Sequence, residues 1–181
     1  MEKTRKINEL RETLNHKDRY VRHNAAIELA NLGEPVAVAP LMEALHHESG
    51  IFRRHHTTQA LIQIGEPALP ALTQAVAEES RGRVCAAYAL YRIDNSKLDI
   101  LIPTWINALH DADEEVRSDA AWVLGEIGKT ARATVPVLIQ RLRDKRESAD
   151  VRVKVAHALA KMREPTANVG FALIQALRDE N

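Results

Sequence analysis

Hydrophobic residues return along this chain at spacings of three and four, and the whole pattern returns after about 30 residues. Within residues 113–128, for example, Val116, Ala120, Leu124 and Ile127 fall on one side of an α-helix at about 100° per residue. Such a stripe is typical of a helix with one buried face. A segment that recurs at a fixed period of this length indicates stacked helical hairpins, each covering the apolar face of its neighbour.

Four kinds of recurring residue locate the repeats. A leucine of the second helix recurs at Leu29, Leu61, Leu90, Leu124 and Leu159. An arginine seven residues earlier recurs at Arg22, Arg54, Arg83, Arg117 and Arg152, in steps of 32, 29, 34 and 35 residues. Apolar-proline pairs at 39–40, 69–70, 102–103 and 135–136 are expected to start the first helix, because proline lacks the N–H that a first-turn residue leaves unpaired. We expect Gly33, Gly65 and Gly128 to end second helices.

These markers predict an all-α solenoid that forms one domain over residues 1–181. The repeats are expected at about 1–35, 36–67, 68–96, 97–129 and 130–165, followed by a terminal helix at 167–179. The composition agrees, with 45% hydrophobic but only 4% aromatic residues, as close helix stacking requires. The terminal helix has an apolar flank and no second helix after it. It either folds back as a cap, or is covered by a partner or by a second copy in a homodimer.

The overall charge argues against two classes of partner. Lys plus Arg and Asp plus Glu number 25 each, so no global field draws in nucleic acid or an anionic membrane. A modest basic cluster at Arg53, Arg54, Arg81, Arg83 and Arg92 is opposed by Asp119 and Glu126. The start of the chain is charged and no run approaches a membrane span, so we expect a cytoplasmic protein. The lone cysteine, Cys85, is expected to be a small second-helix residue.

The pattern Asp-x-x-Val-Arg-x-x-Ala-Ala-x-x-Leu-x-x-Ile/Leu-Gly, at residues 18–33 and 113–128, resembles the HEAT repeat. It is most similar to the short HEAT-like form associated with phycobilisome bilin lyases, and it covers Ile7 to about Leu177. The resemblance implies a right-handed α-α superhelix whose second helices line the concave side. Repeats of this kind also occur in scaffolds, regulators, some DNA glycosylases and a di-iron hydroxylase, so they indicate a fold rather than a function.

The recurring charged residues have a structural interpretation. An Asp just before the second helix, such as Asp18 or Asp113, can accept hydrogen bonds from free N–H groups of the first turn. The arginine four residues later is expected to pair with an Asp of its own or a neighbouring repeat. The predicted ladder consists of Asp18, Arg22, Arg54, Arg83, Asp113, Arg117 and Arg152.

Functional residues are expected where the repeat does not dictate the side chain, on the second-helix face turned away from the core. Helical phase places three columns there. They read Asn24, His56, Cys85, Asp119 and Lys154; Ile27, Gln59, Tyr88, Trp122 and His157; and Asn31, Gln63, Arg92, Glu126 and Lys161. Tyr88 and Trp122 are the sharpest candidates, because exposed aromatic side chains anchor protein interfaces. The alternative is that both rings are buried between repeats.

Two chemical alternatives remain open. The pairs His46-His47 and His55-His56 lie near one turn, but the set of His-Glu dipeptides on which the HEAT-like hydroxylase relies is absent, so no metal is expected. The bilin lyase resemblance implies that Tyr88, Trp122 and His157 would contact an open-chain tetrapyrrole, and that Arg92 or Lys161 would hold its propionates. We favour a scaffold that binds another protein, without catalysis or a cofactor, over a lyase of the phycobilin type.

Overall fold

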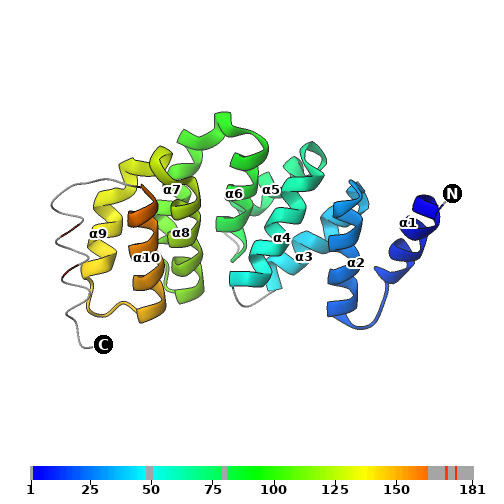
Figure 1. Cartoon of the computed structure of the whole chain (residues 1–181), viewed down its shortest axis with the longest axis horizontal. Coiled ribbons are helices and arrows are strands. Elements are labelled where there is room, and N and C mark those ends of the chain that lie inside the picture. Colours follow the sequence, from blue (N-terminus) through cyan, green and yellow to red (C-terminus); the bar gives the residue numbers. More distant parts are fainter. Residues whose placement is uncertain (1, 48–50, 79–80, 163–169, 171–173, 175–181) are drawn as a thin grey trace. The chain divides into compact units, whose positions relative to one another are not determined.

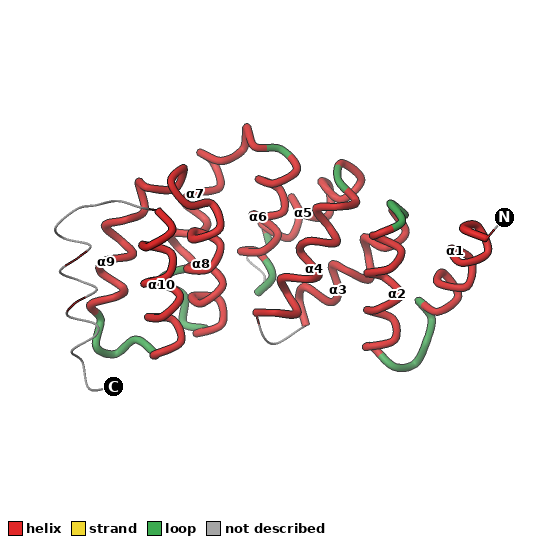
Figure 2. Tube along the Cα trace, in the orientation of Figure 1, coloured by secondary structure: helices red, strands yellow, loops and turns green. Residues whose placement is uncertain are grey.

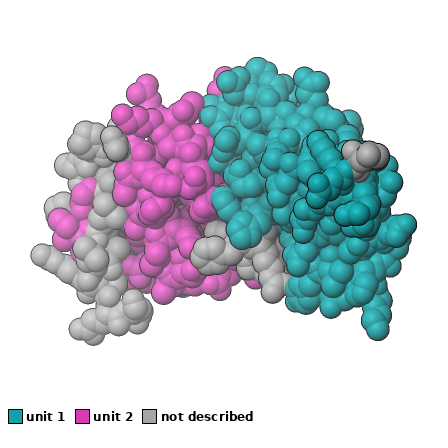
Figure 3. Space-filling view, turned by 45° about the vertical axis from the view of Figure 1, so that its right-hand side comes forward, with its two compact units in different colours: residues 1–98 teal, residues 99–181 magenta. Residues whose placement is uncertain are grey.

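The computed structural model consists of α-helices joined by turns and short 3₁₀ segments (Figures 1 and 2). It describes residues 2–47, 51–78, 81–162, 170 and 174, with residues 51–53 described by their backbone alone. Within these residues there is no β-strand, and the predicted all-α solenoid fold is confirmed. The chain divides into two compact units, residues 1–98 and 99–181 (Figure 3). The predicted boundaries of the individual repeats, and the single domain, stay predictions.

Unit 1 contains three helical hairpins. Its α-helices are α1 (Glu2–Thr13), α2 (Arg19–Asn31), α3 (Val38–His47), α4 (Ile51–Ile64), α5 (Leu69–Ala77) and α6 (Arg83–Ile93), with 3₁₀ segments η1 (Pro35–Ala37), η2 (Glu66–Ala68) and η3 (Asn95–Lys97). Helices α2, α4 and α6 lie side by side as one layer, and α3 and α5 pack behind them (Figure 1). The second helices of the hairpins therefore form one face of the unit.

The described part of unit 2 contains two further hairpins. Its helices are α7 (Leu98–Ala108), α8 (Glu114–Ile127), α9 (Val135–Arg143) and α10 (Ala149–Met162), with the 3₁₀ segment η4 (Gly128–Thr134) between α8 and α9. Helix α8 packs along α10, and α9 packs against α10 (Figure 2). The predicted terminal helix at 167–179, and the homodimer that it could form, lie outside the described residues apart from 170 and 174.

The recurring apolar positions form the core of each unit. In α2, Ala25, Ala26 and Leu29 are buried as predicted, whereas Val21 and Leu32 are only half-buried. Small side chains at these positions allow the helices to approach closely. In unit 2 the helices approach closely at Gly125 of α8, where an added Cβ would lie 3.1 Å from the Cα of Ala158 on α10.

Local residues determine where most helices begin and end. The backbone N–H of Tyr20 donates to Asp18 Oδ1 at 2.8 Å, and that of Glu115 donates to Asp113 Oδ1 at 2.9 Å, so both predicted caps are confirmed. The predicted exit glycines Gly33, Gly65 and Gly128 have φ values of 79°, 78° and 64°, a region that a side chain disfavours.

One predicted helix start is wrong. Pro40, Pro70 and Pro136 lie in the first turn of α3, α5 and α9, but Pro103 lies inside α7, which begins at Leu98. Before Pro103, η3 leads directly into α7, so this helix starts earlier than the apolar-proline marker indicates. Proline inside a helix removes one i→i−4 hydrogen bond without necessarily ending the helix.

Two of the recurring arginines, Arg22 and Arg117, bind the turns between helices. Nη1 of Arg22 donates to the carbonyl oxygens of His16 and Lys17 at 2.9 and 3.2 Å. Nη1 of Arg117 donates in the same way to Asp111 and Ala112, at 2.8 and 3.0 Å.

The acids that these arginines approach differ from the predicted aspartate ladder. Arg22 lies 3.8 Å from a carboxylate oxygen of Glu43, and Arg117 pairs with Glu147 at 2.8 Å. Each glutamate belongs to the following hairpin. Arg54 and Arg152 are buried, and Arg83 is half-buried.

The pair between Arg117 and Glu147 lies in the interior of unit 2. The Glu147 side chain is only 1% exposed and accepts from Nε and Nη2 of Arg117, and also from the backbone N–H of Ser148 at 2.9 Å. Burial acts to raise the pKa of Glu147, but these hydrogen bonds outweigh it and hold the pKa below its ordinary value. The same bonds raise the pKa of Arg117, so both groups are charged in the folded state.

Candidate functional site

The second-helix face of unit 1 brings together most of the residues predicted there. Asn24 and Asn31 of α2 are exposed, as are His56 and Gln63 of α4. Nε2 of Gln63 donates to the carbonyl oxygen of Asn31 at 3.4 Å, which links the two helices across this face. Ile27 and Gln59 lie half-buried between them along the helices. We refer to Asn24, Ile27, Asn31, His56, Gln59 and Gln63 as the amide face.

The prediction that Tyr88 faces solvent is wrong. Tyr88 of α6 is 2% exposed, and residues 84–90 of this helix are all buried. Cys85, in the same run, is also buried and so does not extend the first column. The Tyr88 hydroxyl accepts a hydrogen bond from Arg92 Nη1 at 2.9 Å, and the Arg92 guanidinium lies 5.6 Å from the ring centroid. Arg92 itself is exposed, as predicted.

In unit 2 the predicted residues fall into three environments. Asp119 is 1% exposed, so its predicted place on an open face is wrong, because α8 is buried from Ser118 to Gly125 except for Trp122. Trp122 and Lys154 are half-buried, and His157 is exposed. Glu126 and Lys161 are exposed and form an ion pair with an Nζ–Oε1 distance of 2.5 Å. This part of unit 2 is charged where the amide face is neutral.

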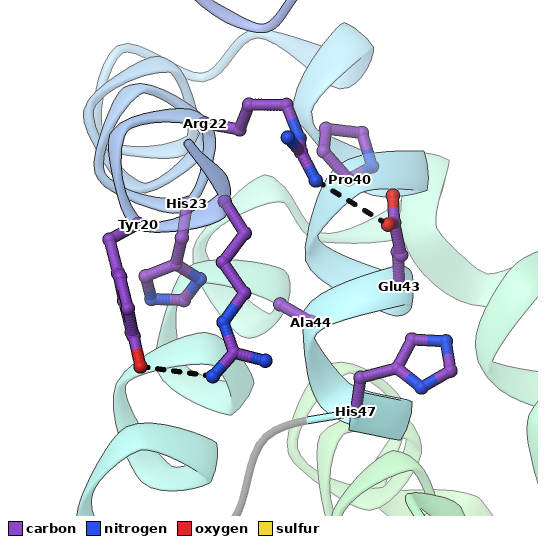
Figure 4. A pocket seen from close by; sticks show the side chains of 8 residues that line it. Tyr20, Arg22, His23, Pro40, Glu43, Ala44 and His47 are labelled. Carbon is purple, nitrogen blue, oxygen red and sulfur yellow. Dashed lines mark hydrogen bonds and ion pairs between the residues drawn. The ribbon is translucent and has the colours of Figure 1, made fainter. Parts of the chain in front are cut away.

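A pocket of about 190 Å³ between α2 and α3 was not predicted from the sequence. Its lining residues are Arg19, Tyr20, Arg22, His23, Pro40, Glu43, Ala44 and His47. Figure 4 shows Tyr20 and His23 extending from α2, and Glu43 and His47 extending from α3 on the opposite side. Tyr20 is 44% exposed, which is unusual for so large a ring in this chain. Because Tyr20 precedes Asn24 by one helical turn, the pocket borders the amide face.

The pocket has a positively charged wall. Arg19 donates from Nη2 to the Tyr20 hydroxyl at 2.9 Å, and its guanidinium lies 4.9 Å from the centroid of the Tyr20 ring. This contact combines a hydrogen bond with a cation–π interaction, which orients the guanidinium beside the ring. Glu43 contributes one negative charge near Arg22 (Figure 4). With both histidines neutral, the lining residues carry one net positive charge.

The predicted histidine cluster does not form a metal site in the part of the chain that the structure describes. His47 lines the pocket between α2 and α3, whereas His56 is exposed on α4. Within the described residues, no three His, Cys, Asp or Glu side chains are placed so that they could hold a metal ion.

The family profile described as HEAT repeats matches residues 7–91 and 102–181, so the chain belongs to the HEAT-repeat family. The resemblance inferred from the sequence motifs is thereby confirmed. No curated protein matches the chain.

Several solved structures share this fold at low sequence identity. YibA of Escherichia coli superposes with a TM-score of 0.67 at 20% identity; the match covers 96% of this chain but only 65% of YibA. The CpcE–CpcF complex of phycocyanin lyase from Nostoc sp. gives a TM-score of 0.54 at 22% identity, covering 97% of this chain and 71% of the other. Human deoxyhypusine hydroxylase, at 17% identity and a TM-score of 0.38, covers 94% and 83% and is too distant to support a functional comparison. The likenesses establish the fold alone.

None of the helices in the described residues is both long enough and apolar enough to span a bilayer.

Proposed function

We propose that this chain is a scaffold that binds a segment of another protein on the second-helix face of its repeats, with the amide face of unit 1 as the principal contact. The observation that supports the proposal most directly is the exposure of four neutral polar side chains on adjacent helices, Asn24, Asn31, His56 and Gln63. These side chains carry no formal charge, although 28% of the residues in the chain are charged. The neighbouring core positions carry the same kind of residue in each repeat, whereas the residues at these positions differ from repeat to repeat.

The chemistry of the amide face suits a polypeptide. A partner segment presents backbone N–H donors and C=O acceptors, and each Asn or Gln side chain carries both a donor group and an acceptor. A neutral face also avoids the cost of desolvating charges when the partner excludes water. In this proposal Arg92 of unit 1 adds to this surface, and unit 2 has a partner-binding surface of its own that consists of Trp122, Glu126, Lys154, His157 and Lys161.

The comparisons support a protein partner more than a pigment. The phycocyanin lyase structure with this fold is a complex of two chains, CpcE and CpcF. The side chains that a tetrapyrrole would need for its propionates already make bonds in this protein, since Arg92 binds Tyr88 and Lys161 binds Glu126. Added bilin should therefore leave the visible absorption of the mixture equal to the sum of its components.

Affinity capture from native lysate with a matched pair of variants tests the proposal. The double variant His56→Ala and Gln63→Ala removes two exposed side chains of the amide face, and Thr73→Ala with Gln74→Ala removes two exposed side chains of α5, in the other layer. Both should leave the melting temperature nearly unchanged, because exposed substitutions rarely alter stability. We expect the first to lose a captured protein that the second retains. Equal capture by both would contradict the proposal.

A further inference from the structure

We propose that the last hairpin of unit 2, residues 128–162, binds an acidic segment of the partner protein along α10. This inference rests on the proposed function and names the chemistry of the segment that the surface of unit 2 selects. Residues 99–127 contain one Lys or Arg and seven Asp or Glu, whereas residues 128–162 contain nine Lys or Arg and three Asp or Glu. The formal charges are therefore −6 and +6, and the neutral total for the chain conceals them.

The acids of residues 99–127 are less accessible than their number suggests. Only Asp99, Glu114 and Glu126 are exposed among the seven, and Glu126 pairs with Lys161. Asp119, the most deeply buried, is 1% exposed. A second copy of the chain would therefore find few free carboxylates here to place against the basic hairpin.

The three acids of the basic hairpin are bound within unit 2. Carboxylate oxygens of Asp144 and Glu147 lie 3.7 and 3.4 Å from Nη1 of Arg141. Asp150 accepts a hydrogen bond from the Ser118 hydroxyl at 2.9 Å. Within the described residues, none of the three pairs with an exposed Lys or Arg, so they do not neutralise the cations at the surface.

Six cations of this hairpin have no acid beside them in the part of the chain that the structure describes. No described carboxylate lies within ion-pair distance of their charged nitrogens. Five are exposed, and Lys154 is half-buried. The six are Lys129, Arg132, Arg143, Lys145, Arg146 and Lys154. The surplus of positive charge therefore lies at the surface of the hairpin.

These cations lie at both ends of α10 and along it. The segment η4 packs at the C-terminal end of α10, where an added Cβ on Gly128 would lie 3.8 Å from the carbonyl oxygen of Lys161. The turn of residues 144–148 leads into the N-terminal end (Figure 1). Lys154 lies between the two ends. With 14 residues, α10 is about 21 Å long, and an extended segment of about six or seven residues covers that length.

The surface suits the carboxylates of a polypeptide better than the phosphates of a nucleic acid. Residues 128–162 contain no Phe, Tyr or Trp, so unpaired bases would find no aromatic side chain to stack on. Glu126 and Asp150 are exposed among the cations, and a backbone with a phosphate at every nucleotide would bring negative charge close to them. A polypeptide can carry its acids only where they face a lysine or an arginine.

Fluorescence anisotropy of a rhodamine-labelled octaglutamate peptide, titrated with the whole chain, tests the inference. Eight extended residues cover about 26 Å, enough for α10 and both of its ends. Octaglutamate should bind at least about tenfold more tightly than octaglutamine, which has nearly the same shape without the charges. Its affinity should fall at least about tenfold as the salt rises from about 0.1 M to about 1 M, because the Debye length falls from about 10 Å to about 3 Å.

A matched pair of double variants locates the site. Lys145→Gln with Lys154→Gln removes one cation from the turn and one from α10, and should reduce the affinity for octaglutamate about fivefold. Lys3→Gln with Lys17→Gln removes the same charge from exposed positions of unit 1 and should leave the affinity unchanged. The urea transition of the tryptophans shows whether unit 2 stays folded in the first variant.

Several outcomes would overturn the inference. They are a dissociation constant above about 1 mM for octaglutamate at low salt, equal binding of the two peptides, equal affinities of the two double variants, or tighter binding of an oligothymidylate of equal charge. A salt-sensitive dimer in sedimentation without peptide would assign the surface to a second copy and would also overturn it. The capture experiment with the His56 and Gln63 variants tests the amide face of unit 1 independently. Failure of this inference and failure of the scaffold proposal therefore give different results.

Discussion

Replacing Glu147 by glutamine should lower the free energy of unfolding of unit 2 by about 3 kcal/mol. The Glu147 side chain is 1% exposed and accepts from Arg117 Nε at 2.9 Å and from Arg117 Nη2 at 2.8 Å. Removing one charge of a buried pair leaves the other without compensation, which costs about 3–5 kcal/mol. We expect the lower end of this range, because the glutamine carbonyl can still accept one hydrogen bond from Arg117.

The matched control is Glu43→Gln in unit 1. Glu43 lies beside Arg22, but its side chain is 61% exposed and the separation is 3.8 Å. Solvent screens such a pair, and exposed pairs contribute about 0–1 kcal/mol. The two substitutions make the same chemical change, so the difference between the stability losses that they cause measures the contribution of burial and geometry.

Tryptophan fluorescence reports on unit 2 alone. The chain has two tryptophans, Trp105 and Trp122, and both lie within residues 99–181. With a urea m-value of about 2 kcal/mol/M, a loss of about 3 kcal/mol shifts the midpoint of the tryptophan transition by about 1.5 M. Glu43→Gln should leave that midpoint in place.

The pH dependence provides a second check. Because the pKa of Glu147 is lower in the folded state than in the unfolded chain, its contribution is fully present above about pH 4.3, the ordinary value for glutamate. The contribution is lost as the pH falls from there through the lower folded-state pKa. The stability difference between the original protein and Glu147→Gln should be constant near neutral pH and shrink in acid. An unchanged urea midpoint at pH 7 would refute the reasoning.

Two further predictions concern packing. Tyr88→Ala should destabilise unit 1 by about 3–5 kcal/mol in far-UV circular dichroism, because the ring is buried; a loss below about 1 kcal/mol would mean that the ring is accessible after all. Gly125→Val should cost about 1–3 kcal/mol in the tryptophan transition, because even a Cβ would lie 3.1 Å from the Cα of Ala158. Ala160→Val, at an exposed position of α10, is the control for the intrinsic cost of valine in a helix, and equal losses in both variants would contradict close packing at Gly125.

Features that depend on nearby residues could be predicted from the sequence. The caps at Asp18 and Asp113 join residues two positions apart, and the exit glycines need only their own backbone conformation. The start of α7 was missed, because the apolar-proline marker at 102–103 lies inside that helix. The acid partner of Arg117 was missed for a different reason. Glu147 is 30 residues away, and the repeat pattern does not indicate which acid lies beside the arginine.

The error at Tyr88 had a signal in the sequence. Residues 84–90 read Val-Cys-Ala-Ala-Tyr-Ala-Leu, without a charged side chain, and a helix that is apolar all round is buried all round. The prediction placed Tyr88 on an open face because it used only helical phase, and Tyr88 lies on the side of the helix opposite the recurring leucine. The amide face was placed correctly, since exposed polar residues alternate with the apolar stripe in α2 and α4.

The pocket had a weaker signal. Arg19 and Tyr20 stand where the fourth repeat has Glu114 and Glu115, and His23 stands where it has Ser118. Sequence alone does not show that α3 brings Glu43 and His47 opposite them.

The turn contacts of Arg22 and Arg117 suggest how such a chain can change its length. Arg22 reaches carbonyl groups five and six residues before it, and Arg117 does the same, so each contact closes within a single hairpin. A duplicated hairpin would bring its own turn and its own arginine, and would need only an acid from its new neighbour. A gain or loss of residues between the turn and the arginine would break the contact at once. The hairpin is therefore the natural unit of duplication, and the turn is where its length is least tolerant of change.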